Sequence, residues 1–97
     1  MVTYEVTAKV RADLVDQYES YMRRHIAEVL ATGKFVAATF ARAPGGNYRA
    51  RYDAADHQAL DRYLAEDTTR LRADFAEHFP NGVELSRVVW ETLQSWP

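Results

Sequence analysis

The chain has 97 residues, of which 47% are hydrophobic and 27% are charged, and its formal net charge at pH 7 is −2. This length and composition predict one globular domain, residues 1–97, rather than a disordered segment. The absence of cysteine excludes disulfides, thiolate metal sites and cysteine nucleophiles.

Targeting and partner signals are sparse. No dense lysine and arginine stripe indicates a nucleic-acid surface, and no apolar run approaches the ~20 residues of a membrane span. The chain does not begin with a basic stretch followed by an apolar one, so we expect no signal peptide and a cytoplasmic protein that binds neither nucleic acid nor membrane.

The first elements are a strand and a helix. Residues 2–10 alternate apolar and polar side chains, which is typical of a half-buried strand. Residues 13–31 repeat apolar side chains at steps of three and four, which predicts an amphipathic helix with Asp13 as its N-cap and Gly33 after its end. Its apolar stripe consists of Leu14, Tyr18, Tyr21, Met22, His25, Ile26, Val29 and Leu30.

A hairpin follows. Residues 35–42 predict a second strand that is apolar on both faces, and residues 48–53 alternate as a third strand. The proline, glycines and asparagine of residues 43–47 are typical of a turn between them.

The last elements are a helix and a strand. Asp56 is placed to cap a helix over residues 57–79, whose apolar stripe is interrupted by Asp67 and, less squarely, by Asp74. Residues 83–90 predict a fourth strand.

The element order βαββαβ predicts an α+β, ferredoxin-like plait. Right-handed crossovers give an antiparallel four-stranded sheet of order 4-1-3-2 with two helices on one face. The other face would be mixed and could meet water or the same face of a second copy. It would carry Thr3, Glu5, Thr7, Arg49, Arg51, Glu84 and Ser86, with Phe35 or Phe40 depending on register.

The residues most able to carry chemistry lie on the two helices. One interpretation is an aromatic core that contains a hydrogen-bonded histidine. The other is a pocket between helices and sheet, in which His25 acts as a general base, Tyr21 assists and Asp67 orients the imidazole. Tyrosines would line that pocket and suit a flat aromatic ligand: Tyr4, Tyr18, Tyr52 and Tyr63, with Tyr48 beside them.

Other site chemistries lack a signal. No serine lies in a nucleophile motif, and the adjacent glycines read as a turn rather than a phosphate loop. Three helical pairs of possible metal ligands occur, but none extends to a three-ligand set: His25 with Glu28, His57 with Asp61, and Asp74 with His78. We therefore expect neither a metal nor a cofactor.

Three segments carry a resemblance to a known family. They are Tyr-Glu-Val-Thr at 4–7, His-Ile-Ala-Glu-Val-Leu-Ala-Thr-Gly-Lys-Phe at 25–35, and Ala-Leu-Asp-Arg-Tyr-Leu-Ala-Glu at 59–66, which runs into Arg-Leu-Arg-Ala at 70–73. In order and spacing they resemble the small bacterial domain of unknown function 4286 family. Ala27 replaces a proline that is usual there, and residues 67–69 replace a usual His-Ala-Pro.

The resemblance implies a relative of the dimeric α/β-barrel proteins. Those include cofactor-independent monooxygenases, polyketide cyclases, isomerases and haem-binding enzymes. We therefore expect a homodimer and a small cofactor-independent cyclase, isomerase or oxygenase acting on an aromatic or polyketide-like molecule. The alternative is a non-catalytic dimeric ligand-binding or assembly module, and a third option is a haem protein with His25 as axial ligand.

Overall fold

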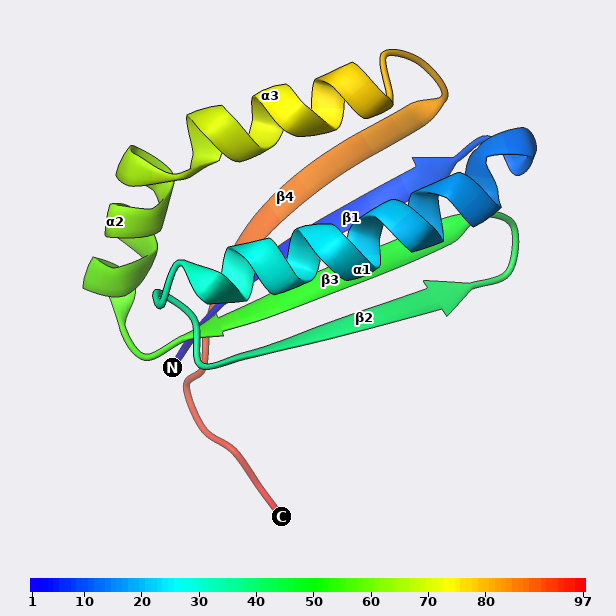
Figure 1. Cartoon of the computed structure of the whole chain (residues 1–97). Helices are drawn as coiled ribbons and strands as arrows, with labels where there is room; N and C mark the ends of the chain where they lie inside the picture. Colours follow the sequence, from blue (N-terminus) through cyan, green and yellow to red (C-terminus); the bar gives the residue numbers. More distant parts are fainter.

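A computed structural model describes all 97 residues. It confirms the α+β, ferredoxin-like fold and the predicted strand order, with all helices on one face of an antiparallel sheet (Figure 1). The sheet runs β2-β3-β1-β4. The strands are β1 (Val2–Val10), β2 (Ala37–Ala43), β3 (Asn47–Ala54) and β4 (Val83–Glu91); the helices are a 3₁₀ turn η1 (Ala12–Leu14), α1 (Val15–Ala31), α2 (His57–Glu66) and α3 (Thr68–His78).

The register of the central strands decides which side chains meet the helices. Tyr4 of β1 lies opposite Tyr52 of β3 and Val89 of β4. Because side chains alternate along a strand, Tyr4 and Tyr52 enter the core on the same face. Phe35 packs on Tyr52 and Phe40 stacks on a second β3 tyrosine, so both phenylalanines also lie on the helix side and neither lies on the open face.

The start of the first helix differs from the prediction. Asp13 lies inside η1, and its carboxylate accepts a hydrogen bond from the Arg11 guanidinium at 2.5 Å instead of capping a helix. The α-helix begins at Val15 without a side-chain cap. The prediction of an Asp13 cap was wrong because a guanidinium two residues away offers that carboxylate a charged partner.

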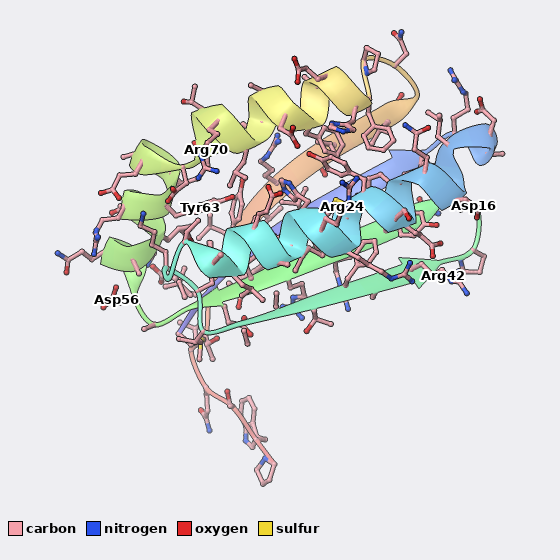
Figure 2. The ribbon with its side chains drawn as sticks, viewed as in Figure 1. Asp16, Arg24, Arg42, Asp56, Tyr63 and Arg70 are labelled. Carbon is pink, nitrogen blue, oxygen red and sulfur yellow. The ribbon has the colours of Figure 1, made fainter.

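The second predicted helix is two helices. Asp56 caps α2 as predicted, because its Oδ1 accepts the backbone N–H of Ala59 at 2.9 Å. The chain then breaks at Asp67, and the Thr68 hydroxyl donates to the Leu64 carbonyl at 2.6 Å. Such a back-bond competes with the helical ladder and bends it. Figure 2 labels Arg70 just past this junction and Tyr63 on α2.

The other face of the sheet has no helix on it. Its charged side chains are Glu5, Lys9, Arg49, Arg51, Asp53 and Glu84. Val88 and Trp90 of β4 also lie there and are about half exposed, and the tail after β4 extends away from the sheet (Figure 1). No helix has the length and apolar character needed to cross a membrane.

Candidate functional site

A small cavity lies between α1, α3 and the helix-facing side of the sheet. Its free volume is about 50 Å³. Most of its wall is apolar or aromatic, and its polar groups are few. The members that bear on chemistry are four tyrosines, a histidine and two arginines: Tyr4, Tyr18, Tyr52, Tyr63, His25, Arg72 and Arg87.

His25 comes to this cavity from the apolar stripe of α1. Its ring stacks on that of Tyr21 with centroids 5.5 Å apart, and it packs edge-to-face with the Phe75 ring, whose centroid is 6.4 Å away. The Nδ1 atom is buried and has no hydrogen-bond partner. An unpaired buried polar group costs about 1–3 kcal/mol, so a group that bonded this nitrogen would remove a penalty.

Burial sets the charge state of His25. Desolvation lowers the pKa of the imidazole, and the carboxylates of Glu28 and Asp74 only partly oppose that shift. The ring is therefore neutral at pH 7. A neutral imidazole can accept a proton, which is the first requirement of a general base.

Tyr21 lies beside His25 but outside the cavity. Its hydroxyl donates to Asp74 Oδ2 at 2.7 Å, a bond that joins α1 to α3. Burial, together with that carboxylate, raises the pKa of Tyr21. Tyr21 lines an outer polar groove of about 100 Å³ with Asp74 and His78, and His25 lines both this groove and the inner cavity.

The structure does not bring Asp67 to His25. The Asp67 carboxylate accepts hydrogen bonds from Lys34 Nζ at 2.6 Å and from Arg70 at 3.2 Å, at the junction of α2 and α3. The hydrogen bond from Lys34 is the main cause that lowers the pKa of Asp67. The prediction that Asp67 orients the imidazole of His25 is therefore corrected. The helix break turns Asp67 toward Lys34, in the segment after α1, and Asp74 is the aspartate whose charge acts on the imidazole.

The four predicted pocket tyrosines all line the inner cavity. Tyr4 lies 6.2 Å from Tyr52 and 6.1 Å from Tyr63 between ring centroids. Burial raises the pKa of Tyr18 and Tyr52, and it raises that of Tyr63 to about 12, so these hydroxyls stay protonated at neutral pH. Tyr48 does not line the cavity: its ring lies 5.0 Å from that of Tyr18 between centroids, and its hydroxyl donates to a glutamate of α1 at 2.5 Å.

Sequence reasoning missed the two arginines of the cavity. Arg72 of α3 donates to the Tyr4 hydroxyl at 3.3 Å. Arg87 lies on the helix-facing side of β4, opposite Val6 of β1. A signal existed for Arg87, because it interrupts the apolar alternation that Leu85 and Val89 continue on that side of the strand.

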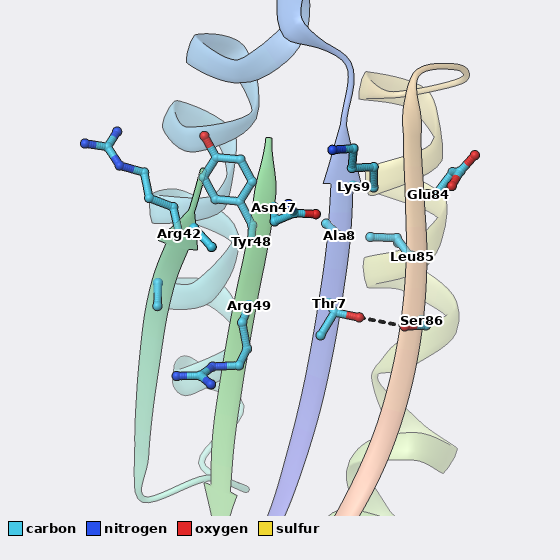
Figure 3. Close-up of a pocket in the computed structure, with 12 residues that line it drawn as sticks. Thr7, Ala8, Lys9, Arg42, Asn47, Tyr48, Arg49, Glu84, Leu85 and Ser86 are labelled. Carbon is cyan, nitrogen blue, oxygen red and sulfur yellow. Dashed lines mark hydrogen bonds between the residues drawn. The ribbon is translucent and has the colours of Figure 1, made fainter. Parts of the chain in front are cut away.

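A wider hollow of about 580 Å³ lies on the open face, near the β2–β3 turn (Figure 3). Thr7 and Ser86 share a hydrogen bond of 2.6 Å across β1 and β4, and Lys9 donates to the Gly45 carbonyl. The hollow contains no histidine, and no group of three metal-ligating side chains gathers anywhere in the chain. The inner cavity is therefore the better candidate for chemistry.

The model of a domain of unknown function, DUF4286, matches residues 1–93. No curated protein matches the chain.

Several solved structures share the fold. SnoaB, a cofactor-independent oxygenase from Streptomyces nogalater, is 22% identical with a TM-score of 0.79, covering 99% of this chain and 96% of that one. An antibiotic biosynthesis monooxygenase is 15% identical with a TM-score of 0.70, covering 97% and 100%. A MhuD variant with two manganese protoporphyrin IX molecules per active site is 16% identical with a TM-score of 0.75, covering 100% and 99%. At such identities the likeness is one of fold.

Proposed function

We propose that this chain, which belongs to the family described as a domain of unknown function, DUF4286, is a cofactor-independent enzyme that removes a proton from an aromatic or polyketide-like molecule. The single observation that carries the proposal is the inward, half-buried His25 with its unpartnered Nδ1. The likeness in fold to a cofactor-independent oxygenase supports the same reaction class.

Proton removal is the step that the expected reaction types share. A cyclase or an isomerase acting next to a carbonyl begins by forming an enolate, and an oxygenase without a cofactor needs an electron-rich carbanion to meet oxygen. In each case a neutral base must face an acidic C–H or O–H bond in a site that excludes water. Because burial lowers its pKa, His25 is unprotonated at pH 7 and suits that role.

The tyrosine wall supports an aromatic substrate. Tyr4, Tyr52 and Tyr63 present ring faces and edges, which attract a flat apolar ligand. The free volume of about 50 Å³ is smaller than the ~150 Å³ cavity that holds benzene. Substrate entry therefore requires side chains to move, and Met22, Arg72 and Arg87 have the long unbranched side chains of the wall.

The narrowness of this cavity favours the alternative, a non-catalytic binding or assembly module with a filled core. It also argues against haem. A porphyrin is far larger than the free volume of the cavity. The His25 ring also lies between Tyr21 and Phe75, which leaves no open side from which its nitrogen could bind a haem iron as axial ligand.

Pairing of two copies through the open face is part of the proposal. This face carries three acidic groups, Glu5, Asp53 and Glu84, and three basic groups, Lys9, Arg49 and Arg51. The acidic groups of one copy can therefore pair with the basic groups of the other. The half-exposed Val88 and Trp90 would add apolar area to that contact.

Hydrogen exchange tests the enzyme directly. The protein is mixed in D₂O with 2-tetralone, an aromatic ketone whose benzylic protons are acidified by its carbonyl, and loss of the proton signal is followed by NMR. We expect exchange faster than buffer, and a loss of about 10²–10⁴-fold in the rate for His25→Gln. His57→Gln, a change at an exposed histidine on α2, is the matched control and should keep the rate. Equal rates for His25→Gln and the unmodified protein contradict the proposal.

A further inference from the structure

Resting on the proposed function, we propose that the molecule bound in the inner cavity is an aromatic carboxylic acid, whose carboxylate is held at the mouth by Arg72 and Arg87. Arg72 and Arg87 both line the cavity, whereas no aspartate or glutamate does. His25 is neutral and adds no charge to the wall. The side chains that line the cavity therefore carry two positive charges and no negative one.

Arg72 and Arg87 differ from most arginines of this chain because neither forms an ion pair. Every other arginine except Arg24 has a carboxylate oxygen within 4 Å. The chain carries 14 acidic residues, so carboxylates are not scarce. Two of its three unpaired arginines nevertheless come to one cavity from two separate elements, α3 and β4.

Both arginines are positioned beside the same stretch of β1. Arg72 reaches the Tyr4 hydroxyl at 3.3 Å. Arg87 lies opposite Val6, the next residue after Tyr4 on the helix-facing side of the strand. Both arginines are exposed residues, whereas the tyrosines that line the cavity are buried, so the arginines lie at its mouth and the tyrosines at its floor.

This arrangement suits a carboxylate joined to a ring. A guanidinium presents parallel N–H donors that match the two oxygens of a carboxylate, and such charge-assisted bonds are about twice as strong as neutral ones. With the carboxylate at the arginines, the ring would lie on Tyr4 and Tyr63, inside the cavity that His25 also lines. The arginines would thus select the substrate, and His25 would act on it.

A binding experiment separates this inference from the proposed function. The probes are 2-naphthoate and its neutral isostere 2-naphthamide, measured by isothermal titration calorimetry with the full chain. We expect naphthoate to bind at least about 10-fold more tightly than the amide, since a hydrogen bond to a charged group contributes about 1.5–3 kcal/mol. Arg72→Gln and Arg87→Gln should each lose about that factor for naphthoate and leave the amide affinity unchanged.

Three further variants sharpen the result. Arg24→Gln removes the other unpaired arginine with the same change in net charge, but Arg24 lies outside the inner cavity and should leave naphthoate affinity unchanged. Arg87→Lys keeps the charge without the paired donors and should bind at an intermediate affinity. His25→Gln should still bind naphthoate even where it abolishes exchange.

The inference is overturned if the unmodified protein binds the amide as tightly as naphthoate, or binds neither. It is also overturned if Arg24→Gln lowers the affinity as much as Arg72→Gln does, because the effect would then be one of net charge. Failure of the proposed function appears instead as an exchange rate that does not depend on His25, with the preference for naphthoate intact.

Discussion

Replacement of Asp67 by alanine should destabilise the fold by about 2 kcal/mol, although Asp67 lies away from the cavity. Its carboxylate bonds Lys34 Nζ at 2.6 Å, and the two side chains are only 12% and 11% exposed. Removing one partner of a buried ion pair costs about 3–5 kcal/mol, because the other charge is left without compensation. Lys34 would retain Glu66 at 2.7 Å, a half-exposed partner that offsets part of this cost, hence the lower value.

Urea denaturation followed by circular dichroism measures this change. For a domain of this size, about 2 kcal/mol corresponds to a melting temperature lower by about 8–16 °C. The control is Asp61→Ala, which removes an exposed α2 carboxylate that forms no ion pair and also gains helix propensity. If Asp67→Ala is no less stable than Asp61→Ala, the Lys34–Asp67 bond does not hold the α2–α3 junction.

The same cluster gives a pH dependence with a definite sign. The pKa of Asp67 is lowered in the fold, chiefly by the hydrogen bond from Lys34. Its contribution to stability is therefore complete above the unfolded pKa near 4 and is lost as the pH falls through the lower folded value. Unfolding curves should show Asp67→Ala losing less stability than the unmodified protein as the pH falls below about 4.

Two further predictions concern the cavity and the open face. His25→Phe should change stability by less than about 1 kcal/mol in thermal melts, because it removes an unpaired buried nitrogen while keeping a ring between Tyr21 and Phe75; a loss above about 2 kcal/mol would mean that Nδ1 has a partner. Arg51→Glu should weaken self-association, measured by light scattering, more than Arg23→Glu on the outer face of α1, and a monomeric unmodified protein at micromolar concentration would contradict pairing.

The strands were predictable because their periodicity is local. The alternation of residues 2–10 gives β1 with the same bounds in the structure, and the cap at Asp56 needs only the backbone three residues ahead. The break at Asp67 is accompanied by the Thr68 bond to the Leu64 carbonyl and by a bond from Lys34, which is distant in the sequence. No helical periodicity contains that information, so a single helix over residues 57–79 was the natural but mistaken prediction.

The same limit applies to the site. The step of three and four along α1 placed His25 on the inner face, and the strand alternation placed Tyr4 and Tyr52 there too. Glu28, on the same helix, and Asp74, on α3, are the carboxylates that act on the pKa of His25. The part of Asp74 depends on how α1 and α3 lie against one another, and the stripe of one helix does not specify its neighbour. The role of Arg87 could not be predicted, because the sequence does not show which elements pack over the side of the strand that Leu85 and Val89 share with it.

The strand order also bears on how the chain folds during synthesis. β1 has two neighbours, β3 and β4, and β4 is the last of the four strands to be synthesised. Residues 1–54 can assemble three strands and α1 first, with one side of β1 left as an open edge. An unpaired edge is a template for association with other chains. Until β4 is synthesised, this edge of β1 stays open to a strand of another chain, and the lengths of α2 and α3 set how long that interval lasts.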